Sequence, residues 1–154
     1  ALALLFIGYQ GFQDGKGDKG LYAQFEYEDP GLPITMSESK NYKLYDALTY
    51  FGENNYSKCI EKLKEIDNSQ NDTISYYLGA SYYYENNFAK AIKNLNSSNG
   101  DKSAFAEESE WLIILSSLKN DQSKNAMDIL NKITTEPQHQ FYKQAVELKN
   151  KIKN

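Results

Sequence analysis

Residues 54–63, NNYSKCIEKL, recur 32 residues later as residues 86–95, NNFAKAIKNL, and the two stretches align without a gap. A weaker third copy, DQSKNAMDIL at residues 121–130, follows after a further 35 residues. Within each copy the apolar residues recur at intervals of three and four, which places them on one face of a helix. An internal repeat with a period of about 34 residues predicts helix pairs that stack, because one short pair cannot bury its apolar face alone.

The middle unit carries residue types that resemble tetratricopeptide repeat proteins. Leu78, Gly79 and Tyr82 match the L-G-x-x-Y spacing of the first helix in a unit of that family. Ala91 and Leu95 match the A-x-x-x-[FL] spacing of the second helix. Small residues at these positions allow the two helices of a pair to cross closely.

The other two units keep less of this pattern. In the first unit, Ala47 stands at the glycine position and Cys59 at the small position of the second helix, and both side chains are small enough for close packing. In the third unit, Ile114 and Ser117 stand at the glycine and tyrosine positions. This departure leaves the distance between the two helices of the third pair open.

The resemblance covers residues 42–153 and implies an all-α fold, a tetratricopeptide-type α-solenoid of about three helix pairs. Pro137 is expected to end the third pair, and residues 138–153 to form a C-terminal capping helix with lysines on its outer side. The apolar residues of this capping helix are Phe141, Tyr142, Ala145, Leu148 and Ile152.

The N-terminal part of the sequence has a different character. Residues 1–12, ALALLFIGYQGF, form the one long apolar run. As a helix this run would be about 18 Å long, which is well short of the roughly 30 Å hydrocarbon core of a membrane. We expect the remnant of a truncated membrane anchor, with a strand or helix docked on the protein as the alternative. Residues 13–41 then form a glycine- and proline-containing linker arm, predicted to be extended with one short strand or helical turn.

The sequence GKGDKG at residues 15–20 matches the G-x-G-x-x-G pattern of phosphate-binding loops. A dinucleotide site needs a strand that ends at the first glycine and a helix that begins at the last. Here two polar residues precede the glycines, and Pro30 follows within ten residues. The pattern is therefore interpreted as a solvated linker.

The composition excludes several function classes. The 154 residues include 21 acidic side chains and 17 basic ones, all of which are lysine, so nucleic acid is not an expected partner. Cys59 and His139 are the single cysteine and the single histidine, so an internal disulfide is impossible and a zinc site is not expected. We expect no cofactor, no metal and no catalytic residue, and hence a protein that is not an enzyme.

Three acidic residues could suggest acid–base chemistry. Glu107, Glu108 and Glu110 are predicted to open the first helix of the third unit, with Ser103 as a candidate N-cap. Carboxylates at a helix N-terminus stabilise the helix dipole, and a helix start that faces water lacks the sheltered pocket that acid–base catalysis needs. The structural interpretation is therefore preferred.

His139 and Cys59 are also given structural roles. His139 follows Pro137 in a turn between helices and has no cysteine or acid nearby at ligand spacing, so we expect a solvated turn residue. Cys59 stands at a packing position with no basic residue placed to ionise it, so we expect a buried, inert thiol.

A narrower resemblance comes from YLG at residues 77–79, A-E-x-x-x-W-L at residues 106–112 and Y-x-x-A-x-x-L at residues 142–148. With LYAQF at residues 21–25, these motifs resemble small envelope proteins of Gram-negative bacteria, in which one membrane helix precedes a periplasmic repeat array. The resemblance implies attachment to the bacterial inner membrane through residues 1–12, with the repeats in the periplasm. A soluble protein is the alternative.

In the resembling family, the first helix of each unit lines a concave groove that binds a protein or peptide. The corresponding residues here are Leu44, Leu48, Phe51, Tyr76, Ala80, Tyr83, Tyr84, Trp111, Leu115 and Leu118, with Tyr142 extending the row. Aromatic side chains with a polar tip are enriched at the centres of protein interfaces. The alternatives are that these rings fill the core between helices or are covered by the chain's own N-terminal arm.

The resemblance therefore implies a non-catalytic protein–protein interaction scaffold that binds a partner protein in an aromatic groove at a bacterial membrane. The clamp of lysine, arginine and asparagine that other members use for a carboxylate-terminated chaperone peptide is absent at these positions, so such a peptide is not the expected ligand. The alternative function is a constitutive structural subunit of a larger envelope complex, which would use the outer face and the arm as well.

Overall fold

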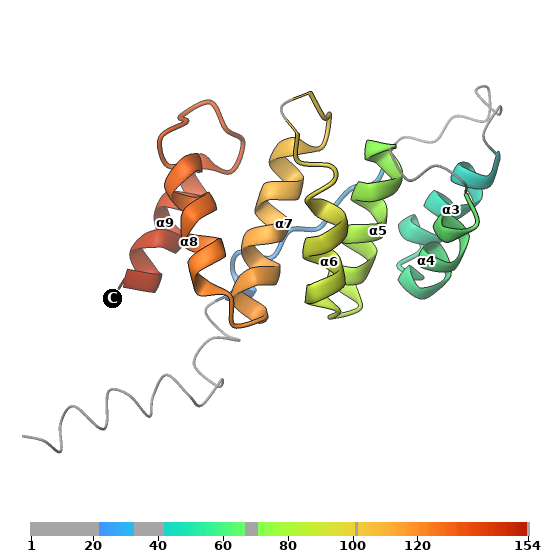
Figure 1. Cartoon of the computed structure of the whole chain (residues 1–154), viewed down its shortest axis with the longest axis horizontal. Coiled ribbons are helices and arrows are strands. Elements are labelled where there is room, and N and C mark those ends of the chain that lie inside the picture. The colour runs from blue at the N-terminus through green and yellow to red at the C-terminus, as the bar shows by residue number, and fades with distance from the viewer. Residues whose placement is uncertain (1–21, 33–41, 67–70, 101, 154) are drawn as a thin grey trace, which may run out of the picture.

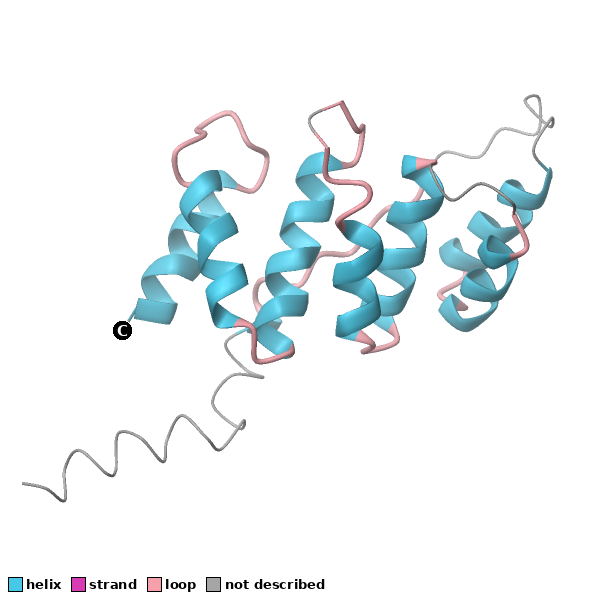
Figure 2. Ribbon diagram, viewed as in Figure 1, coloured by secondary structure: helices cyan, strands magenta, loops and turns pink. Residues whose placement is uncertain are grey.

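The computed structural model describes residues 22–32, 42–66, 71–100 and 102–153, and within them it contains seven helices and no strand (Figure 1, Figure 2). The prediction of an all-α fold is confirmed. The predicted anchor at residues 1–12 and the rest of the predicted linker arm, at 13–21 and 33–41, lie outside the described residues. The helices are α3 (Tyr42–Gly52), α4 (Tyr56–Lys64), α5 (Asp72–Tyr84), α6 (Phe88–Leu95), α7 (Ala106–Lys119), α8 (Ser123–Ile133) and α9 (Tyr142–Lys153).

The helices stand side by side in one row, and each packs against the next one in the chain (Figure 1). The pairs α3–α4, α5–α6 and α7–α8 follow the three repeat units, and α9 packs on α8 at the end of the row. Helix α5 also contacts both α3 and α7, so the first helices of the three pairs neighbour one another. None of the helices in the described part of the chain is both long enough and apolar enough to cross a membrane.

The turn inside each helix pair has the same backbone geometry in all three units. Asn54, Asn86 and Asp121 adopt left-handed conformations with φ of 59°, 58° and 56°. In each turn, the following backbone N–H donates to the carbonyl five residues earlier, over 2.8 Å in all three cases. This geometry ends the first helix, and asparagine and aspartate tolerate it better than other residues with side chains.

The second asparagine of each NN doublet begins the next helix. The side chain of Asn55 accepts the backbone N–H of Lys58 at 3.3 Å, and the side chain of Asn87 accepts that of Lys90 at 3.4 Å. In the third copy Gln122 makes no such bond. The first asparagine of the doublet ends one helix and the second begins the next. These two roles explain why the doublet is the clearest match between the first two copies of the repeat.

Gly79 allows the close approach of α5 and α6 that the family resemblance implies. A Cβ atom placed there would lie 2.5 Å from Cγ and 3.0 Å from the backbone nitrogen of Leu95. At the equivalent positions of the other pairs, Ala47 and Ile114 are fully buried. Cys59 is a free, buried cysteine, as predicted.

Two predicted helix starts are wrong by a few residues. The capping helix α9 begins at Tyr142 rather than 138, because residues 134–141 form a loop that packs against α7. Ser103 is not the N-cap of α7: the N-cap is Phe105, and the Ser103 hydroxyl instead accepts the backbone N–H of Phe105 at 3.2 Å.

Candidate functional site

The described part of the N-terminal arm, residues 22–32, crosses the side of the helix row formed by α5 and α7 (Figure 1, blue). We call it the arm segment. It begins with a helical turn in which the backbone N–H of Phe25 donates to the carbonyl of Tyr22 at 2.9 Å, and it has no regular structure from Glu26 onward. The side chains of Tyr22 and Phe25 are buried with the rest of the hydrophobic core.

Two aromatic side chains of the helices bind the main chain of the arm segment. The indole Nε1–H of Trp111 on α7 donates to the carbonyl of Phe25 at 3.2 Å. The hydroxyl of Tyr84 on α5 donates to the carbonyl of Tyr27 at 2.8 Å and accepts the backbone N–H of Asp29 at 3.0 Å. Hydrogen bonds from side chains thus replace the backbone pairing that an extended segment would make in a sheet.

Three more donors bind the carboxylates of the arm segment. The hydroxyl of Tyr83 and the ammonium of Lys119 both donate to Glu26, and the two donors lie 3.0 Å apart. The hydroxyl of Tyr76 donates to Asp29. Hydrogen bonds to charged acceptors are the stronger kind, so these contacts favour carboxylates at these two positions. We call Tyr76, Tyr83, Tyr84, Trp111 and Lys119 the arm-binding face.

Aromatic rings enclose the apolar side chains of the arm segment. The ring of Phe25 meets Trp111 edge to face at 6.5 Å between centroids, and the ring of Tyr27 meets Phe141 in the same way at 5.3 Å. The ammonium of Lys151 on α9 lies 5.3 Å above the Phe25 ring. Such contacts add to the area burial of each ring.

Burial keeps the phenols of the site protonated. It is the largest cause that raises the pKa of Tyr76 and of Tyr83, and the neighbouring charges of Asp29 and Glu26 raise them further. Burial likewise raises the pKa of Tyr27 to about 12. The hydroxyls of Tyr76 and Tyr83 therefore stay protonated and can donate throughout the ordinary pH range.

The arm segment covers several of the predicted groove residues, which is one of the alternatives that the sequence left open. Tyr76, Tyr83, Tyr84 and Trp111 contact it directly. Whether these residues bind a partner protein stays a prediction. The other predicted residues are placed as follows: Phe51, Leu115, Leu48, Ala80 and Leu118 are buried, and Leu44 and Tyr142 are half-buried.

The patterns in the sequence did not indicate Lys119 or the acidic residues of the arm segment as part of the site. One signal was present: residues 73–84 of α5 and 111–118 of α7 contain no charged side chain. A helix with no charged face is buried on all sides. Each of these two helices therefore needed a cover on the side away from its pair partner, and Glu26 and Asp29 belong to that cover.

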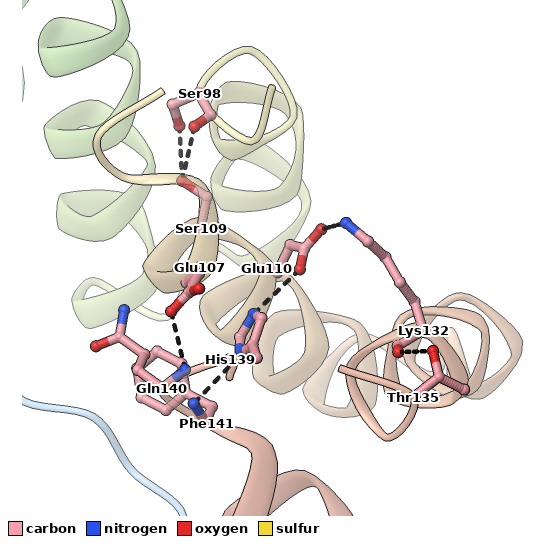
Figure 3. A network of polar contacts seen from close by, with 9 residues as sticks. All are labelled: Ser98, Glu107, Ser109, Glu110, Lys132, Thr135, His139, Gln140 and Phe141. Carbon is pink, nitrogen blue, oxygen red and sulfur yellow. Dashed lines mark hydrogen bonds and ion pairs between the residues drawn. The ribbon is translucent and has the colours of Figure 1, made fainter. Parts of the chain in front are cut away.

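A second polar cluster corrects the predictions for His139 and Glu110 (Figure 3). His139 is not a solvated turn residue but is buried, with Nε2 3.3 Å from a carboxylate oxygen of Glu110. Glu110 does not face water either: only 8% of its side chain is exposed, and Lys132 donates to its other oxygen at 2.5 Å. The reason is that the loop before α9 folds over the first half of α7, where Glu107 accepts the backbone N–H of Gln140 at 2.9 Å.

This cluster positions the aromatic wall of the site. The Nδ1 atom of His139 accepts the backbone N–H of Phe141 at 3.1 Å, so Nε2 carries the proton and donates to Glu110. Phe141 then stacks on Trp111 with ring centroids 5.0 Å apart. The buried carboxylate therefore acts through His139 and Phe141 on the ring that binds the arm segment.

The described residues contain no group of three side chains that could hold a metal ion. Burial raises the pKa of the Cys59 thiol and so disfavours its reactive thiolate. Comparisons of the chain with protein-family models, with curated proteins and with solved structures found no match.

Proposed function

We propose that the chain is a non-catalytic protein–protein interaction scaffold whose arm-binding face binds an extended segment of a partner protein. The observation that carries this proposal is the mode of binding of the arm segment. Trp111 and Tyr84 donate to main-chain carbonyls of an irregular segment, at 3.2 and 2.8 Å. Donors that bind a main chain can accept any segment of suitable shape, which is how peptide-binding domains gain affinity.

We further propose that the scaffold is of the tetratricopeptide type. Three features support this proposal: the order of helix pairs, the left-handed residue in the turn of each pair, and the close approach of α6 to Gly79. Arrays of this kind present the first helices of their pairs as one continuous surface, and here α5 and α7 carry the arm-binding face.

The alternative proposal is a constitutive subunit of a larger envelope complex. It is favoured by the burial of Tyr22 and Phe25, which are 7% and 4% exposed and so belong to the core. In that case the arm segment is a permanent part of the fold. The second helices of the three pairs, α4, α6 and α8, would then contact other subunits. Attachment to a bacterial inner membrane through residues 1–12 stays a prediction.

Site-specific photocrosslinking in cells tests the proposal. A photoreactive phenylalanine analogue replaces Tyr84, which is half-buried beside the arm segment, or Lys93, which is exposed on α6. The scaffold proposal predicts an adduct with another protein from position 84 and none from position 93. Adducts from position 93 alone would favour the constitutive subunit, and no adduct from position 84 would contradict the scaffold.

A further inference from the structure

The arm segment shows which ligand chemistry the arm-binding face recognises. The face supplies hydrogen-bond donors: the hydroxyls of Tyr76 and Tyr83, the indole N–H of Trp111 and the ammonium of Lys119. The hydroxyl of Tyr84 donates as well and accepts one N–H. A ligand that satisfies this face must therefore be rich in acceptors, and carboxylates satisfy such donors best.

The positions of these acceptors define a pattern. Two carboxylates, Glu26 and Asp29, are three residues apart. The carbonyl of Phe25, just before the first carboxylate, accepts a hydrogen bond, and so does the carbonyl of Tyr27, which lies between the two. The two rings at 25 and 27 meet the rings of Trp111 and Phe141. The pattern reads aromatic, acidic, aromatic, any residue, acidic.

The arm segment is partly open to solvent after Phe25, although the side chains of Tyr22 and Phe25 are buried. It has no regular structure after its first turn, and Glu26 and Glu28 are exposed. The donors of the face belong to helices that do not depend on the arm segment for their own backbone hydrogen bonds. A second segment of the same pattern would remake each bond that the first one loses, so exchange costs little in hydrogen bonds.

Resting on the proposed function, we propose that the partner contributes an extended acidic–aromatic segment of this pattern and that the arm segment is its built-in competitor. A competitor in the same chain acts at an effective concentration, which is on the order of millimolar for a short tether. The partner segment therefore binds the intact chain weakly, and binds it strongly once the arm segment is released.

The test uses the full chain and a labelled synthetic peptide with the sequence of residues 22–32, YAQFEYEDPGL. Phe25→Ala with Glu26→Lys weakens the arm segment, because it removes a buried ring and places a cation beside Lys119. The matched control is Glu28→Lys, which makes the same change of charge at an exposed residue of the same segment. Fluorescence anisotropy measures peptide binding to each chain.

We call the chain with Phe25→Ala and Glu26→Lys the weakened chain. The proposal predicts that the peptide binds the weakened chain at least about tenfold more tightly than it binds the wild type or the Glu28→Lys control. A peptide carrying Glu26→Gln and Asp29→Asn is expected to lose at least about tenfold in affinity, because amides replace the charged acceptors. Equal binding of the acid and amide peptides would overturn the recognition of carboxylates. No binding to a weakened chain that circular dichroism shows to be folded would overturn the proposal altogether.

A second measurement covers the case in which the weakened chain does not fold. Hydrogen exchange of the wild-type chain is followed by mass spectrometry with a large excess of the unlabelled peptide. Displacement predicts faster exchange at residues 22–32 and unchanged exchange in α5. Unchanged exchange at residues 22–32 would overturn the competitor role.

These outcomes separate this proposal from the proposed function. A partner crosslinked from Tyr84 whose contact segment lacks the acidic–aromatic pattern would overturn this proposal and leave the scaffold in place. Another outcome is that the wild-type chain forms a dimer and the chain with Phe25→Ala and Glu26→Lys does not. That result would mean that a second copy of the chain supplies the bound segment, and it would overturn the proposal that a different protein supplies it.

Discussion

The indole of Trp111 lies flat on the ring of Phe141, with the two ring planes 5° apart. Phe141 precedes α9, and His139 of the same loop contacts Glu110 on α7. The stack therefore joins the loop before α9 to α7, the helix whose Trp111 binds the arm segment. The ring of Phe141 also contacts the ring of Tyr27, so this loop and the arm segment meet at Phe141.

Phe141→Ala tests this junction. The substitution removes a buried ring and is expected to lower the free energy of unfolding by about 3–5 kcal/mol, as Phe→Ala changes in cores do. It should also speed hydrogen exchange of the arm segment, because Tyr27 and Trp111 both lose a partner ring. Tyr142→Ala, at a half-buried neighbour, is the control. Equal losses in urea denaturation for the two variants would argue against the junction.

Gly79→Ala tests the close approach of α5 and α6. The new Cβ would meet the buried Leu95 side chain and its backbone nitrogen, so we expect a loss of about 1–3 kcal/mol in stability. Gly52→Ala is the matched control, because nothing besides its chain neighbours and its own helix backbone lies within 4 Å of its Cβ position, and its φ is not left-handed. Urea denaturation measures both. A Gly79→Ala chain as stable as the wild type would mean that the helices are further apart.

Asn86→Ala tests the turn geometry of the repeat. A left-handed conformation costs an alanine roughly 1–2 kcal/mol, so this variant should lose about 1 kcal/mol relative to asparagine. Asn86→Gly should not lose stability through backbone strain, since glycine adopts the left-handed conformation freely. Asn96→Ala serves as a control, because Asn96 has a right-handed φ of -59°. If thermal denaturation gives Asn86→Gly the same loss as Asn86→Ala, the backbone explanation is wrong.

Stability is expected to fall at alkaline pH because of the buried tyrosines. Burial raises the folded-state pKa of Tyr27 to about 12, from the ordinary value of 10.0, and raises that of Tyr83 as well. The folded chain then holds protons that the unfolded chain releases, so this stabilisation is complete below about pH 10 and is lost as the pH rises toward about 12 and beyond. Urea denaturation at about pH 9 and about pH 11, on either side of the unfolded-state pKa, measures the loss, which Tyr83→Phe should reduce. A Tyr83→Phe chain with the full pH dependence would contradict this assignment.

Much of the helix row could be predicted from the sequence. The periodic apolar residues, Gly79 and the NN doublets are local signals, because each acts within one helix pair. Tyr83 and Trp111 were predicted to line a groove from their positions in the resembling family, and both rings are buried. Whether a partner, the core or the arm covers them depends on contacts such as Trp111 with Phe25, 86 residues apart, which no local pattern reports.

The errors have the same origin. His139 follows a proline in a polar turn, and such a turn is usually exposed; only the folding of the whole loop over α7 buries it beside Glu110. Lys119 ends α7 like any basic residue near a helix C-terminus. Its pairing with Glu26 depends on where the arm segment lies, and the three-dimensional fold determines that position.

The indole N–H resonance of Trp111 tests the central claim most directly, because the chain has a single tryptophan. In the wild-type chain the N–H is bound to the carbonyl of Phe25, so its exchange with solvent should be slow. In the chain with Phe25→Ala and Glu26→Lys it should exchange rapidly. A saturating amount of the peptide of residues 22–32 should then restore protection, and the amide peptide with Glu26→Gln and Asp29→Asn should not. An indole that stays protected in the weakened chain without peptide would contradict the account.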